Sequence, residues 1–207
     1  MISALVLAAA SADTPKPLRS LSYSFTAATA SAHYSGTITA DVMGGSQDGA
    51  LVVRFAQTAS GAPGQNFPSA VCWVYGDTRV SCKDPKALSP VETEIGHLLG
   101  RNFVNGDNLD ANNHWQIAGD VGSSKLTDDF TVTANNNGIL AITESRKITG
   151  TGASQHDAQI SYDMNRTVPL AVHYTQTGSA AGTVDLKLTA DSLPAATPAP
   201  APTPTKP

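Results

Sequence analysis

The sequence predicts a mainly β protein. It indicates one antiparallel meander sheet of about ten strands, curved into a half-barrel or open barrel, with one short amphipathic helix. Three observations support this fold class. Apolar and polar residues alternate along most of the chain. Gly, Asn and Pro separate the alternating segments and leave links too short for parallel crossovers. One segment near the middle follows a helical period instead.

The segment “GTITADV” shows the strand pattern most clearly. Ile38, Ala40 and Val42 point to one face, while Thr37 and Thr39 point to the other. The same alternation occurs in “GALVVRFAQT”, “DDFTVTA”, “GILAITE”, “HDAQISYDM”, “TVPLAVHYTQ” and “GTVDLKLTADS”. The segment “LSYSFTA” and two cysteine-bearing segments bring the total to about ten strands. Because the links are short, we expect neighbours in sequence to be neighbours in the sheet.

The helical segment is “LSPVETEIGHLLGRNF”, and its start and end carry recognisable signals. Ser89 fits the N-cap position, and Pro90 fits the first helical position. Glu92 completes a capping box with Ser89. Gly100 fits the C-terminal stop. The sequence therefore predicts a helix of about ten residues across one side or mouth of the sheet.

This helix carries one apolar stripe at helical spacing. Its members are Val91, Ile95, Leu98 and Leu99. Such a stripe either completes the core of the sheet or lines a pocket for an apolar molecule. These four residues are therefore our candidate contacts for an apolar ligand.

The two ends of the chain differ from the body. Residues 1–12 read as a secretory signal peptide, possibly truncated because no Lys or Arg precedes its apolar run. An A-x-A site places cleavage after Ala12. Residues 13–193 form a single β-rich domain, of a size usual for one sandwich or barrel. Residues 194–207 are rich in Pro, Ala and Thr and predict a disordered tail or a stalk.

Composition excludes two classes of partner. The thirteen basic residues are scattered and the net charge is −4, so nucleic acid is not an expected partner. No segment approaches the roughly 18 apolar residues of a membrane-spanning helix. Together with the signal peptide, this predicts an exported protein, in the periplasm or outside the cell.

The only two cysteines, Cys72 and Cys82, flank a Gly-Asp-Thr turn. A hairpin centred on Asp77 places them opposite each other, where Cα separations of about 4.5–5.5 Å suit a disulfide. A redox pair is typically C-x-x-C, and a structural zinc site needs four ligands. Neither pattern is present here. We therefore predict a structural disulfide.

The sequence shows no catalytic signature. The five histidines are spread one to a segment, and we expect each to be a surface or half-buried residue: His33, His97, His114, His156 and His173. The polar stretch 105–115 departs from the calcium-loop spacing and is interpreted as an Asx-rich loop. No nucleophile elbow, phosphate loop or zinc-protease motif occurs. We predict no catalytic residue, no metal site and no cofactor.

The pattern as a whole resembles the half-barrel cell-envelope proteins of the LolA and LppX type. The features that carry the resemblance are the signal peptide, the successive antiparallel strands, the helix, and the closing “ISYDMNRTVPLAVHY” and “VDLKLTADS” segments. They cover most of residues 20–192. The resemblance implies a curved sheet around an apolar cavity that holds a lipid or acyl chain. It transfers no binding residue to this chain.

Three functions follow as expectations. The first is an exported, non-catalytic envelope carrier of a lipid or other apolar molecule. The alternative is a secreted surface or matrix interaction module, displayed on the Pro-rich stalk and acting through exposed Thr, Asn and aromatic residues. A hydrolase with a site assembled from distant residues ranks third.

Overall fold

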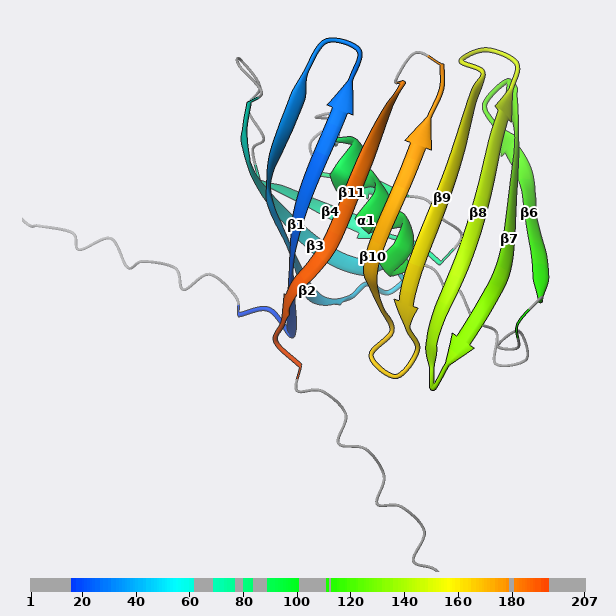
Figure 1. Ribbon diagram of the computed structural model, residues 1–207. Coiled ribbons are helices and arrows are strands. Elements are labelled where there is room, and N and C mark those ends of the chain that lie inside the picture. Colours follow the sequence, from blue (N-terminus) through cyan, green and yellow to red (C-terminus); the bar gives the residue numbers. More distant parts are fainter. Residues whose placement is uncertain are drawn as a thin grey trace, which may run out of the picture.

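Figure 1 shows the fold of the chain in a computed structural model. The structure describes residues 16–61, 69–76, 80–83, 89–100, 111, 113–178 and 181–193. The predicted signal peptide 1–12 and the tail 194–207 lie outside the described residues, as does most of the polar stretch 105–115.

The protein is mainly β, and its strands form one open antiparallel sheet. The strands are β1 (Arg19–Thr29), β2 (His33–Gly45), β3 (Leu51–Ser60), β4 (Ala70–Val74), β5 (Val80–Cys82), β6 (His114–Val121), β7 (Ser124–Asn136), β8 (Ile139–Thr149), β9 (Ser154–Asp163), β10 (Val168–Gln176) and β11 (Gly182–Asp191). Their order is β5-β4-β3-β2-β1-β11-β10-β9-β8-β7-β6. The single described helix, α1 (Pro90–Gly100), lies within the curve of the sheet (Figure 1).

The predicted fold class is confirmed, but the strand order holds one difference. Strands β5 and β6 follow each other in the chain and lie at opposite edges of the sheet. The first and last strands, β1 and β11, pair at its centre instead, for example through Phe25 and Leu186. The segment between β5 and β6 is not a short turn, because it contains α1. These two strands therefore do not pair, and the segment connects the two opposite edges of the open sheet.

One face of the sheet, which we call the inner face, is apolar and buried. On β1 it presents Leu21, Tyr23 and Phe25, which expose 3% or less of their surface. Intervening residues such as Ser24 and Thr26 face the opposite way, on the outer face. This is the period-two alternation that the sequence predicted. The buried apolar residues of β1–β4 and β7–β11 form one cluster with the apolar residues of α1.

Helix α1 begins with the predicted capping box. The backbone amide of Glu92 donates to Ser89 Oγ at 3.1 Å, and that of Ser89 donates to Glu92 Oε2 at 2.9 Å. The Ser89 hydroxyl also donates to Gln57 Oε1 on β3 at 2.7 Å. The N-terminus of α1 is thus satisfied locally and attached to the sheet.

The apolar stripe of α1 faces the sheet. Val91, Ile95 and Leu98 expose 1% of their surface or less, and Leu99 is half-buried. The helix packs against β10 on one side and against β3, β4 and β5 on the other. Gly96 allows this approach, because a Cβ atom there would lie 3.0 Å from a methyl group of Val80.

The predicted disulfide is confirmed. Cys72 and Cys82 are partners in the β4–β5 pair and are bonded, with their Cα atoms 4.0 Å apart. Val74 and Val80 are partners in the same pair, as the hairpin centred on Asp77 required. The bond fixes β5 to the sheet at an edge where it has only one neighbouring strand.

We expect the double variant Cys72→Ala/Cys82→Ala to lose roughly 2.5–3 kcal/mol of unfolding free energy, because a loop of about ten residues is no longer closed in the unfolded chain. Denaturant titration of both proteins measures this loss. Mass spectrometry of the non-reduced wild type should first show no free thiol. Two free thiols in the mature protein would contradict the bond itself.

Candidate functional site

The inner face beneath α1 is the first candidate site. The predicted ligand contacts Val91, Ile95, Leu98 and Leu99 lie together on the side of α1 that faces the sheet. In this structure their side chains occupy the inner face, since the first three are almost fully buried. An apolar ligand bound here has to take the place of these side chains.

A cluster of ionisable residues, all buried except the half-buried Arg146, adjoins α1 on the same inner face, and we call it the ionic cluster. It consists of Glu94 on α1, Asp128 on β7, Glu144 and Arg146 on β8, and His156 on β9. Arg146 Nε donates to Asp128 Oδ2 at 3.1 Å, and its Nη2 donates to Glu144 Oε1. His156 Nε2 lies 3.7 Å from Glu94 Oε2.

The register of the strands brings this cluster together. Arg146 is paired with Asp128 on β7 and with His156 on β9, so the three form one row across the sheet. Glu144 lies two residues from Arg146 and therefore on the same face. The side chains of Asp128, Glu144 and His156 are each at most 6% exposed.

The carboxylates of the ionic cluster shift the pKa values of neighbouring groups. Burial by itself lowers the pKa of the Arg146 guanidinium, but the carboxylates of Glu144, Glu94 and Asp128 outweigh it, so this pKa lies above its usual value. Burial raises the pKa of the Tyr174 hydroxyl, and the Glu94 carboxylate raises it further. The carboxylates of the cluster therefore stabilise the charged form of Arg146.

Tyr174 on β10 is the aromatic neighbour of the cluster. Its ring centroid lies 4.6 Å from that of His156. Its hydroxyl has no hydrogen bond to any described residue, although the residue is only 3% exposed. The tyrosine ring thus packs on the imidazole of the cluster.

The sequence-based expectation for His156 was wrong. A surface or half-buried position was expected, and His156 is 5% exposed. The cause is the alternation of β9, which places His156 on the same face as Ala158 and Ile160. This signal is present in “HDAQISYDM”, whose first residue is the histidine. The other histidines are exposed or half-buried, as expected.

The outer face is a second candidate site, because its polar side chains form a row across the strands. Consecutive members of this row are partners in neighbouring strands, from β7 to β3 across the centre of the sheet: Thr131, Thr143, Gln159, His173, Asp185, Thr26, Ser35 and Ser60. At its middle, His173 Nδ1 and Asp185 Oδ1 lie 2.7 Å apart. We call these residues the outer row.

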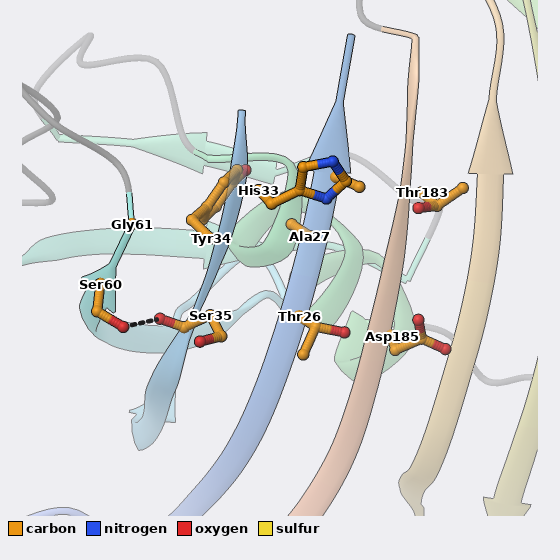
Figure 2. Close-up of a pocket in the computed structure, with 10 residues that line it drawn as sticks. Thr26, Ala27, His33, Tyr34, Ser35, Ser60, Gly61, Thr183 and Asp185 are labelled. Carbon is orange, nitrogen blue, oxygen red and sulfur yellow. Dashed lines mark hydrogen bonds between the residues drawn. The ribbon is translucent and has the colours of Figure 1, made fainter. Parts of the chain in front are cut away.

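Shallow hollows follow the outer row. One of about 420 Å³ lies over Thr26, Ser35 and Asp185, and Figure 2 shows its lining, with the Ser60 hydroxyl donating to the Ser35 carbonyl. Two others, of about 390 and 530 Å³, share Gln159 and His173. Hydroxyl, amide, imidazole and carboxylate groups line the first two, and the third also has apolar lining residues such as Ala141 and Ala171. The polar groups suit a ligand that both donates and accepts hydrogen bonds.

A scan against protein-family models and a search of the curated proteins found no match to this chain. Within the described ranges, α1 is the only helix, and no helix there has both the length and the apolar character needed to cross a bilayer.

Replacing Arg146 should reveal how strongly the ionic cluster depends on it. We expect Arg146→Met to lower the unfolding free energy by about 3–5 kcal/mol, because the buried Asp128 and Glu144 lose their cation. The matched control is Arg54→Met, which removes a more exposed pair with Asp41 and should cost about 1 kcal/mol or less. Denaturant unfolding at neutral pH measures both losses. An equal loss in the two variants would contradict the importance of Arg146.

Proposed function

We propose that the protein is an exported, non-catalytic carrier that binds a lipid or another apolar molecule on the inner face of its sheet, beneath α1. The observation that carries the proposal is that the inner face is apolar and that α1, which is not part of the sheet, covers it. The sheet is open between β5 and β6, so α1 can leave this face without breaking a strand pair.

When the ligand binds, its contacts with the inner face replace those of the apolar stripe of α1. In the ligand-free protein the stripe of α1 occupies the inner face, and in the loaded protein the ligand does. Burial of apolar area stabilises both states, at about 25 cal/mol per Å². The ligand therefore competes with the closed position of α1, and its apparent affinity falls with the fraction of closed protein.

Two further features support a carrier that works outside the cytoplasm. The disulfide between Cys72 and Cys82 persists in an oxidising compartment. The predicted signal peptide, residues 1–12, directs export. We propose the periplasm or the extracellular space as its location.

We expect Leu98→Ala to lower the stability of the ligand-free protein by about 2–5 kcal/mol, since it empties a packed site. Because it weakens the closed state, the variant should also bind a fluorescent fatty acid more tightly. Leu140→Ala is the matched control: it removes the same atoms from the core strand β8, so it should lower stability without tightening binding.

Native mass spectrometry of protein purified from its own host should show a co-purified apolar molecule. The carrier function would be rejected if no such molecule is found and if neither the wild type nor Leu98→Ala binds the fluorescent fatty acid.

The outer row favours a second function, an interaction module for a polar polymer such as a polysaccharide. On this account a double variant Gln159→Ala/His173→Ala should lose binding on a glycan array, because two hollows share these side chains. Its unfolding free energy should change by less than about 0.5 kcal/mol, as for most surface changes. Binding that survives this variant but fails in Leu98→Ala would contradict the outer row as the site.

A further inference from the structure

We propose that Glu94, Glu144 and His156 form a binding site for a divalent transition-metal ion, with zinc the best fit. The three side chains come from α1, β8 and β9, which are far apart in the sequence and meet only in the fold. The proposal does not depend on the carrier function.

The geometry of the donor atoms suits a small ion. One ligand atom from each residue lies within 4.8 Å of the other two. Glu94 Oε2 and His156 Nε2 are 3.7 Å apart, too far for a hydrogen bond. In a tetrahedral site with metal–ligand bonds of about 2.0–2.2 Å, two ligands are about 3.3–3.6 Å apart. This pair is thus almost in place, and a rotamer adjustment of Glu144 completes the set.

The ligand types select the ion. Calcium and magnesium prefer oxygen ligands alone, whereas a set of one imidazole and two carboxylates suits zinc and its neighbours. Three protein ligands also leave a fourth position free, as in many zinc sites that hold a water molecule. Tyr174 packs on His156, is 3% exposed, and its hydroxyl makes no hydrogen bond to a described residue. It is the candidate group to bind that water.

Neighbouring residues orient the ligands, as is usual around metal sites. Arg146 donates to one oxygen of Glu144 and also to Asp128. The ring of Tyr174 packs on that of His156. A metal ion at this site would bond α1 directly to β8 and β9, and it would hold the helix on the inner face of the sheet.

The test uses the full mature protein after treatment with a chelator. Titration with Co²⁺, followed by its visible absorption, and with Zn²⁺, followed by calorimetry, should show one ion per chain and a rise in melting temperature. Glu94→Gln and His156→Gln should each weaken binding by more than about 100-fold, since even outer residues of such sites cost about 10–100-fold. Tyr174→Phe, which keeps all three ligands, should weaken binding by about tenfold.

His114→Gln is the matched control. It removes an exposed histidine that also lies beside a carboxylate, so it should leave metal binding unchanged. If the ligand variants fail to fold, NMR of the Co²⁺-loaded wild type decides: the ring protons of His156 should show the largest paramagnetic shifts. Three results would each overturn the site. They are the absence of one bound ion per chain, paramagnetic shifts centred on another histidine, and an unchanged metal affinity in a folded Glu94→Gln variant.

Discussion

Burial of the inner face is the constraint on which the rest of the structure depends. An eleven-stranded sheet that does not close has one apolar face to cover and two free edges, β5 and β6. The segment that joins these edges contains α1, and its stripe of Val91, Ile95 and Leu98 packs on that face. The capping box and the bond from Ser89 to Gln57 set where the helix begins. The disulfide holds β5, one of the strands on which α1 packs, in the sheet.

The ionic cluster is the exception to an apolar inner face. Carboxylates buried at this depth are costly unless they are paired, and Arg146 pairs with two of them. A purely apolar set of residues would cover the sheet at less cost in desolvation. Glu94 lies on α1, and its contact with His156 connects the cluster to the helix. Attachment of the helix, by an ion pair or through a metal ion, is the role that its position indicates.

Local patterns were sufficient to predict much of this fold. The alternation around Ile38, the capping signals at Ser89 and the opposed cysteines each depend on residues close in sequence, and the structure contains all three features. The pairing of β1 with β11 depends on how distant segments meet, which no local signal encodes. The ionic cluster was missed for the same reason. Only the burial of His156 was readable, from the alternation of β9. The resemblance to LolA and LppX proteins stays a prediction.

Hydrogen exchange of the α1 amides in the ligand-free protein tests the central claim, that α1 is the cover of the inner face. If α1 covers the inner face, the amides of Ile95 to Leu98 are protected from exchange. The opening that exposes them should cost less free energy than the opening that exposes the amides of the central strands β1 and β11, because α1 can leave without breaking the sheet. Exchange of these amides at the rate of an unstructured peptide would contradict the account, since the inner face would then need another cover.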